Sequence, residues 1–294
     1  MSKRAAVFPG QGSQRPGMGK EAFETPAGRT VFDSVSAATG KDVAALCFDS
    51  DEETLRRTEN AQIALFTASV ASYQSSPQPG VVVMAGHSVG EYAALACAGV
   101  FSVTDGAKLV ARRGELMAEA GRTRPGAMAA VLGLNAETIS RSLPSDGVAV
   151  VANDNCPGQV VISGDAEAVK QAAEALKTAG AKRCLPLNVS GAFHSPLMAD
   201  AAERMRDAVA TVDFSAGSLP VVSNVTAQPE SDWPELLIRQ LVSPVRWTES
   251  VRTMLTMGTE EFVEFGPGDV LTGLLKRIAP EASGWNFDSR ETKD

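Results

Sequence analysis

The stretch that decides the fold is MAGHSVGEYAA, residues 84–94, which follows the apolar run of residues 81–83. It places Ser88 between Gly86 and Gly90, where a strand-like segment passes into a helix-like one. A G-x-S-x-G spacing is typical of a nucleophile elbow, a sharp strand-to-helix turn that displays one hydroxyl and leaves no room for side chains at the flanking glycines. The alternative is a glycine-rich turn whose serine only caps the helix, because serine is a favoured N-cap residue.

Short apolar runs alternate with amphipathic stretches on both sides of this turn, which predicts a mainly parallel sheet covered by helices. Strands are expected at residues 5–8 and 80–85. The second of these is apolar throughout, as in strands that are buried on both faces. The tail from Pro280 onward is mixed in character and is expected to be peripheral.

Residues 126–189 follow a different order, β-α-β-β-α-β, which is typical of the split βαβ or ferredoxin-like unit. We therefore expect an α/β protein with a large catalytic subdomain, similar to the α/β-hydrolase fold, formed by residues 1–124 and 191–294. A small ferredoxin-like subdomain of residues 125–190 would interrupt it. The crevice between the two is the default place for a substrate.

The composition is that of an ordinary globular protein, since 44% of the 294 residues are hydrophobic and 21% are charged. The net charge of -8 argues against a nucleic-acid-binding protein, whose binding surface is normally basic. No apolar run has the length of a membrane span, and the amino-terminal segment has too few apolar residues for a secretory signal. We therefore expect a cytoplasmic protein. The four cysteines are far apart in the sequence and are expected to be reduced thiols without a metal.

The chain contains two histidines that could activate Ser88 as a nucleophile, His87 and His194. His87 adjoins Ser88, and neighbours in a tight turn point in different directions, so it is a poor partner. His194 lies in a turn-rich loop, residues 191–196, immediately before a helix, where catalytic side chains are often displayed. The alternative is that His194 is a surface or capping histidine.

No acidic residue stands out as the third member of a Ser-Asp-His triad in the chain order of the hydrolases. Asp105, which falls between Ser88 and His194, resembles a helix cap. The other aspartates in this interval belong to the insert: Asp146, Asp154 and Asp165. A backbone carbonyl or a side-chain amide could orient the imidazole instead. The missing acid therefore weakens an esterase interpretation more than it weakens the nucleophile interpretation.

Two further features could act on an acyl group. The Gly10-Gln11-Gly12 loop lacks the third glycine of a dinucleotide fingerprint, since Arg15 stands there. Its backbone N–H groups are instead free to face an oxyanion.

Arg112 and Arg113 form a basic pair in the helix after the elbow helix. If one of them faces the crevice, its planar guanidinium could bind a substrate carboxylate through two parallel hydrogen bonds. The alternative is that both arginines lie on a solvent-exposed face of the helix.

Seven stretches carry a resemblance that covers nearly the whole chain in order. They are FPGQGSQ at 8–14, GHSVGEY at 86–92, RRGELM at 112–117, NDNCPGQVVISG at 153–164, GAFHSPLM at 191–198, LIRQLVSPVRW at 237–247 and FGPGDVLTGLLKR at 265–277. Together they resemble the malonyl-CoA:acyl carrier protein transacylases and the related acyltransferase domains of polyketide and fatty-acid synthases. The G-x-S-x-G motif alone is a weak signal, whereas the ordered set is a strong one.

The resemblance implies a ping-pong acyl transfer. Ser88 would attack the malonyl thioester with His194 as general base, giving a malonyl-serine ester and free coenzyme A. The phosphopantetheine thiol of acyl carrier protein would then take the acyl group. The backbone N–H groups of Gln11 and Val89 would form the oxyanion hole. The main-chain carbonyl of Gln240 would hold the imidazole in place of the missing acid.

The resemblance also implies how the acyl group is selected. Arg113, rather than Arg112, matches the family arginine that pairs with the malonyl carboxylate. Acetyl-CoA lacks this carboxylate, and sites of this kind can discriminate by about 10⁴-fold. Met117 and Phe193 would line the substrate pocket. Phe193 accompanies a preference for malonyl over methylmalonyl groups, although Gly191 stands where malonyl-selective domains often carry another histidine.

The implied substrate is malonyl-CoA and the implied partner is acyl carrier protein. Coenzyme A enters as a thioester substrate, so no cofactor is expected, nor a metal, a nucleic acid or a membrane. The chain is expected to be a monomer. Carrier proteins are acidic, so docking is expected at basic residues that match the family: Lys182, Arg183, Lys276 and Arg277.

Three alternatives remain beside a malonyl transferase of fatty-acid synthesis. A free-standing acyltransferase that serves a polyketide synthase would have the same catalytic residues. A serine esterase or thioesterase would release malonate to water. A non-catalytic module would bind the carrier protein without using the Ser88 hydroxyl.

Overall fold

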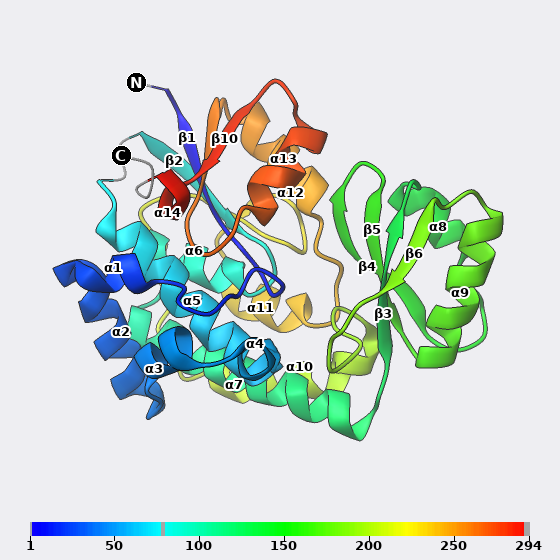
Figure 1. The fold of residues 1–294 in the computed structure, drawn as a ribbon, viewed down its shortest axis with the longest axis horizontal. Coiled ribbons are helices and arrows are strands. Elements are labelled where there is room, and N and C mark those ends of the chain that lie inside the picture. The colour runs from blue at the N-terminus through cyan, green and yellow to red at the C-terminus, as the bar shows by residue number, and fades with distance from the viewer. Residues whose placement is uncertain (1, 78–79, 291–294) are drawn as a thin grey trace.

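The computed structural model describes residues 2–77 and 80–290 and has two separate sheets (Figure 1). The large sheet has the strand order β10-β9-β1-β2-β7-β8. Its strands are β1 (Arg4–Phe8), β2 (Val81–Gly86), β7 (Val221–Val222), β8 (Pro229–Glu230), β9 (Glu261–Glu264) and β10 (Ser283–Asn286). All neighbouring pairs are parallel except β7 and β8. The carboxyl ends of β1, β2, β7 and β9 therefore meet at one edge, the usual site for a ligand in such sheets.

Helices cover both faces of the large sheet. Those of the first half are α1 (Lys20–Glu24), α2 (Pro26–Thr39), α3 (Val43–Asp49), α4 (Glu52–Arg56), α5 (Thr58–Ser75), α6 (Gly90–Ala98) and α7 (Val103–Thr123). Those of the second half are α10 (Ala199–Val209), which follows a short 3₁₀ turn (Pro196–Met198), α11 (Trp233–Gln240), α12 (Trp247–Thr256), α13 (Val270–Ile278) and α14 (Phe287–Arg290).

Alternate residues of β1 face two different cores. Ala6 and Phe8 pack into a large cluster with residues of α2, α5, α6, α7, α10 and α11. Ala5 and Val7 pack into a second cluster, on the other face, with residues of α12 and α13. All four side chains are buried. This two-sided burial is why the central strands are apolar throughout instead of alternating with polar residues.

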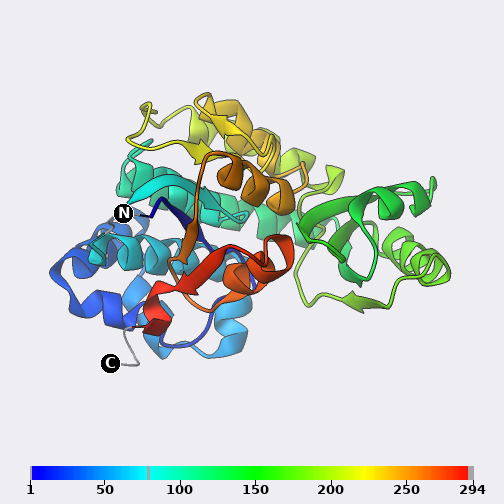
Figure 2. The same ribbon diagram turned by 90° about the horizontal axis from the view of Figure 1, so that it is seen from above.

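The small sheet is antiparallel and lies at one end of the molecule (Figures 1 and 2). Its strands are β3 (Ala127–Leu132), β4 (Ala149–Cys156), β5 (Gln159–Gly164) and β6 (Arg183–Pro186), in the order β4-β5-β3-β6. Helices α8 (Ala136–Ser142) and α9 (Ala166–Thr178) follow β3 and β5 and share one apolar cluster with the sheet. The chain order is thus the predicted β-α-β-β-α-β. Backbone hydrogen bonds from Val245 to Ala152 and from Asp154 to Val245 join β4 to the large part.

Two expectations about single segments are wrong. The tail from Pro280 to Arg290 is not peripheral, because residues 283–286 add the edge strand β10 to the large sheet; residues 291–294 lie outside the described residues. Asn286 is buried and donates to the carbonyls of Gly266 and Gly268, which ties this strand to the loop after β9. Asp105 does not cap α7. The cap is Ser102, whose hydroxyl accepts from the backbone N–H of Asp105.

The four cysteines are free thiols, as predicted. Burial raises the pKa of Cys47 to about 12 and also raises the pKa of the other three thiols, so none of them is a thiolate near neutral pH. In the described part of the chain no helix is both long enough and apolar enough to cross a membrane.

We expect Gly90→Ala to destabilise the protein by about 3 kcal/mol, because overpacking against rigid backbone is costly. A Cβ at position 90 would lie 2.1 Å from the carbonyl oxygen of Phe8. The matched control is Gly273→Ala in α13, where nothing lies within 4 Å of the new Cβ. The control should raise stability by up to about 1 kcal/mol through helix propensity. Urea unfolding measures both changes, and an unchanged midpoint for Gly90→Ala would contradict the packing of the turn.

Candidate active site

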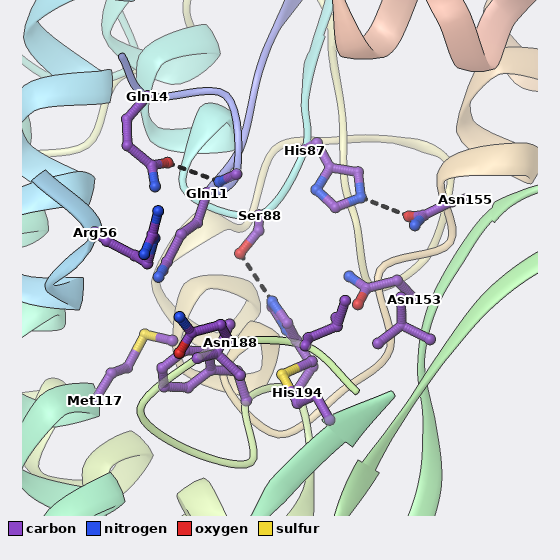
Figure 3. A pocket seen from close by; sticks show the side chains of 16 residues that line it. Gln11, Gln14, Arg56, His87, Ser88, Met117, Asn153, Asn155, Asn188 and His194 are labelled. Carbon is purple, nitrogen blue, oxygen red and sulfur yellow. Dashed lines mark hydrogen bonds between the residues drawn. The ribbon is translucent and has the colours of Figure 1, made fainter. Parts of the chain in front are cut away.

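The turn between β2 and α6 displays the Ser88 side chain at the carboxyl edge of the large sheet (Figure 3). Ser88 has a left-handed backbone, with φ of 53°, which is rare for a residue with a side chain. A Cβ on Gly86 would lie 1.9 Å from the carbonyl carbon of Gly90, so the turn requires glycine there. The N-cap of α6 is Val89 and has no side-chain cap. Ser88 is therefore the half-buried apex of an elbow and not a helix cap.

Asn224 holds the elbow in this strained shape. Its side-chain oxygen accepts from the backbone N–H of Ser88 at 2.7 Å, and its Nδ2 donates to the carbonyl of Gly86 at 2.6 Å. Asn224 was not identified from the sequence. The available signal was its place two residues after the strand β7, whose carboxyl end lies beside that of β2.

His194 lies next to Ser88 although 106 positions separate the two residues in the chain. The Ser88 hydroxyl is 2.8 Å from Nε2 of His194, and Nδ1 is 2.9 Å from the main-chain carbonyl oxygen of Gln240. A carbonyl oxygen can only accept, so Nδ1 carries the proton and Nε2 is free to accept from the hydroxyl. His194 is thus neither a surface nor a capping residue, since it is only 4% exposed and has a left-handed backbone with φ of 55°.

The environment of His194 keeps the imidazole neutral. Burial, and to a smaller extent the positive charge of Arg113, lower the pKa of His194 to about 3. The hydrogen bond to Gln240 opposes these effects. A neutral imidazole is the form that can take the proton of the serine hydroxyl.

His87 has a different partner, in agreement with the sequence argument. Its Nε2 is 2.9 Å from Oδ1 of Asn155 in β4, and its ring lies 5.7 Å from that of Trp247. This contact joins the elbow to the small sheet.

Arg113 is fully buried directly behind Ser88. Its Nη2 donates to the Ser88 hydroxyl at 3.1 Å and to Oε1 of Gln240 at 2.8 Å, and its Nη1 donates to Oε1 of Gln62 at 2.6 Å. In the described residues, its Nε has no acceptor. The face of the Tyr92 ring lies 5.4 Å from the guanidinium, close enough for a cation–π contact. Because an arginine keeps its charge even when buried, a fixed cation lies beside the hydroxyl.

Arg112 points away from this site. Its guanidinium is 3.7 Å from a carboxylate oxygen of Glu115 on the exposed side of α7. The two members of the basic pair therefore have different environments, one solvated and one at the crevice.

A buried carboxylate completes the network behind the site. Gln240 donates from Nε2 to the Ser88 carbonyl and to Glu91, and Glu91 also accepts from the backbone N–H of Asn224. Burial raises the pKa of Glu91 to about 7, against the opposing effects of these hydrogen bonds and of Arg113. Glu91 and Gln62 were not singled out from the sequence. The available signal was that each polar side chain directly precedes an apolar run, at residues 63–66 and 92–98.

A cavity of about 400 Å³ opens in front of Ser88 and His194, between the two sheets (Figure 3). Residues from eight stretches of the chain line it: Gln11, Gly12, Gln14, Arg56, His87, Ser88, Met117, Met128, Asn153, Asn155, Val161, Leu187, Asn188, Val189, Phe193 and His194. The structure thus places Met117 and Phe193 at the pocket, together with Gln11. Within the described residues, the backbone N–H groups of Gln11 and Val89 have no acceptor, so both remain free to donate. No group of three or more His, Cys, Asp or Glu side chains in residues 2–77 and 80–290 could hold a metal ion.

The basic residues expected to bind the carrier are exposed and lie outside the cavity. Lys182 and Arg183 are at one end of the small sheet. The backbone N–H of Lys182 donates to the carbonyl of Leu132 in β3, and Arg183 lies opposite Leu132 in the strand register. Arg277 of α13 reaches the turn at this same end and donates to the carbonyl of Pro157 at 2.7 Å. Lys276 precedes it on α13.

Comparison with known proteins gives one family. The model of the acyl transferase domain matches residues 6–285. The chain is 45% identical to the malonyl CoA-acyl carrier protein transacylase of Bacillus subtilis, over 95% of this chain and 91% of that one. It is 46% identical to the protein of the same name from Escherichia coli, over 95% and 93%.

Solved structures agree in fold. The crystal structure of an acyl carrier protein S-malonyltransferase from Vibrio cholerae is 44% identical, has a TM-score of 0.93 and is matched over 97% of this chain and 96% of that one. A malonyl-transacylase solved in complex with a type II PKS acyl-carrier protein is 42% identical, with a TM-score of 0.92 and the same coverage. The α/β fold with its two sheets is therefore shared with these enzymes.

The buried imidazole predicts an unusual pH dependence of Ser88 reactivity. A serine-directed organophosphonate should label Ser88 at a rate that changes less than about twofold between pH 8 and pH 5, because the pKa of His194 lies near 3 and protonation removes the base only below this range. His194→Ala should slow labelling by about 10³-fold or more. A tenfold fall in the wild-type rate between pH 7 and pH 5.5 would show instead that the base titrates near the ordinary value of 6.5.

Proposed function

The chain belongs to the acyl transferase domain family, and we propose that it transfers a malonyl group from malonyl-CoA to acyl carrier protein in fatty-acid synthesis through an ester on Ser88. The observation that carries the proposed mechanism is the joint contact of the Ser88 hydroxyl with His194 and Arg113, at 2.8 and 3.1 Å. One neighbour takes the proton of the nucleophile. The other is a fixed cation that suits the free carboxylate of a malonyl group.

In the first half-reaction, the Ser88 oxygen attacks the thioester carbonyl while its proton passes to Nε2 of His194. The backbone N–H groups of Gln11 and Val89 stabilise the oxyanion of the tetrahedral intermediate. The carbonyl of Gln240 holds the imidazole through Nδ1, the role that a carboxylate has in serine hydrolases. The imidazolium then returns its proton to the leaving thiolate, and coenzyme A departs.

In the second half-reaction, the phosphopantetheine thiol of acyl carrier protein replaces coenzyme A. The imidazole of His194 takes the proton of the thiol, and the sulfur attacks the ester carbonyl. The Ser88 oxygen leaves with that proton, which restores the free enzyme. Each step is the reverse of its counterpart in the first half, so the same groups serve both.

Arg113 provides the selectivity for the acyl group. Acylation turns the Ser88 hydroxyl into an ester oxygen, which frees an N–H of Nη2 to bind a malonyl carboxylate beside the free N–H of Nη1. An acetyl group leaves these donors without an anion in a dry site, which raises the barrier for the wrong substrate. Met117 and Phe193 limit the space around the acyl group.

We also propose how the chain is divided, where it acts and where the carrier binds. The large part, residues 1–124 and 191–294, is an α/β-hydrolase-like subdomain, and residues 125–190 are a ferredoxin-like one. The chain acts as a cytoplasmic monomer. The acidic carrier docks on the exposed cations that surround one end of the small sheet and the carboxyl end of α13: Lys182, Arg183, Lys276 and Arg277.

Replacing Arg113 with Ala should lower the rate of malonyl loading by about 10³-fold or more while acetyl loading changes by less than tenfold, because only the malonyl group carries the anion. The matched control is Arg112→Ala, which removes the neighbouring charge from a solvated ion pair and should leave both rates within twofold. Quenched-flow measurement of acyl-enzyme formation from malonyl-CoA and acetyl-CoA gives both rates. Equal losses for the two substrates in Arg113→Ala would show that Arg113 has a structural role alone and does not select the acyl group.

A further inference from the structure

The lining of the cavity has a distinct chemistry beyond Ser88 and His194. Five of the side chains around it are amides: Gln11, Gln14, Asn153, Asn155 and Asn188. Among the described residues that line it there is no carboxylate, and the single permanent cation is Arg56. Figure 3 shows Arg56 and Gln14 on the side of the pocket opposite Asn153 and Asn155. The cavity therefore offers hydrogen-bonding amides along its walls and one positive charge.

Arg56 has donors available for a ligand. It is the last residue of α4, and its side chain is 46% exposed. Its ion-pair partner in the same helix, Glu52, is 77% exposed and lies 3.6 Å away. Such a solvated pair contributes little free energy, so an incoming anion can displace it.

The backbone that carries Arg56 is joined to both loops that build the site. Two residues further along the chain, the buried hydroxyl of Thr58 is 2.8 Å from that of Ser190, in the loop before His194. The same hydroxyl accepts from Nε2 of Gln11 at 3.5 Å, in the loop after β1. These hydrogen bonds therefore hold the chain around Arg56 in place relative to Ser88, because they connect it to the two loops of the site.

We propose that Arg56 binds the phosphate at the head of the pantetheine arm, which is common to coenzyme A and to the carrier protein. This inference rests on the proposed function. A malonyl thioester of phosphopantetheine has an anion at each end, the acyl carboxylate and the phosphate. The enzyme has a guanidinium at each end of the path, with Arg113 buried behind Ser88 and Arg56 on the exposed wall.

The amides that line the cavity match the middle of the same ligand. The pantetheine arm contains two amide groups, each with one donor and one acceptor. A side-chain amide also has both kinds of group and can pair with either. Arginine suits the far end because its planar fork binds phosphate oxygens through two parallel hydrogen bonds. Arg56 is thus a specificity-determining residue for both half-reactions, and it does not touch the reacting atoms.

The test compares two thioesters that differ only in the phosphate, malonyl-4′-phosphopantetheine and malonyl-pantetheine, at low ionic strength. The measured quantity is the ratio of kcat/KM for the phosphorylated over the unphosphorylated thioester. Arg56→Gln should lower this ratio about tenfold, mainly through KM, since one charge-assisted contact is lost. Arg56→Lys should restore part of it. The control Arg112→Gln removes an equal charge outside the cavity and should leave the ratio unchanged.

The two sources of the phosphate are tested separately. Arg56→Gln should raise KM by a similar factor for malonyl-CoA in the first half-reaction and for the holo carrier in the second. An unchanged ratio in Arg56→Gln would overturn the inference. So would a loss confined to the carrier, which would mean that Arg56 contacts the carrier surface, or a loss confined to coenzyme A. Failure of the wild-type protein to form a malonyl ester from any thioester would overturn the proposed function itself.

Discussion

The burial of the Arg113 guanidinium is the constraint on which the rest of the site depends. A lone charge removed from water costs several kcal/mol, and it is tolerated only when polar groups surround it. Here the groups come from separate elements: Gln62 on α5, Gln240 on α11 and Ser88 at the elbow. The hydrogen bonds to this one guanidinium therefore fix α5, α11 and the elbow relative to each other. The same arrangement aims the charge at the nucleophile, so structural and chemical requirements coincide.

The replacement of a triad carboxylate by a carbonyl follows from this charge. The carbonyl of Gln240 orients His194 without adding a negative charge, while burial and Arg113 both disfavour the imidazolium. The base is therefore neutral at rest, and its proton affinity is low. On the proposed function, a substrate carboxylate paired with Arg113 cancels the nearby positive charge and raises the pKa of His194 when a proton has to be taken up. A substrate without that carboxylate does not raise the pKa of His194, which adds a second source of selectivity.

Local patterns predicted much of the fold and the central groups of the site. The apolar run before Gly86 and the glycines around Ser88 predicted a strand, a sharp turn and a helix, because those requirements are steric and local. The bracing of the elbow by Asn224 could not be read in this way, since it depends on the pairing of β7 with β2. The edge strand β10 was missed because four residues of mixed polarity carry little periodicity. Arg56 was missed because an arginine in a polar helix has the same local pattern whether it faces solvent or a cavity.

The most direct test of the central claim is mass spectrometry of the intact protein after mixing with malonyl-CoA and no acceptor, followed by peptide mapping. We expect one malonyl group on Ser88 that persists while coenzyme A is released once per chain, and that is discharged when holo acyl carrier protein is added. We also expect that Ser88→Ala carries no malonyl group. Steady release of malonate without a lasting adduct, or a malonyl group on another residue, would contradict the convergence of Ser88, His194 and Arg113 on a transferred acyl group.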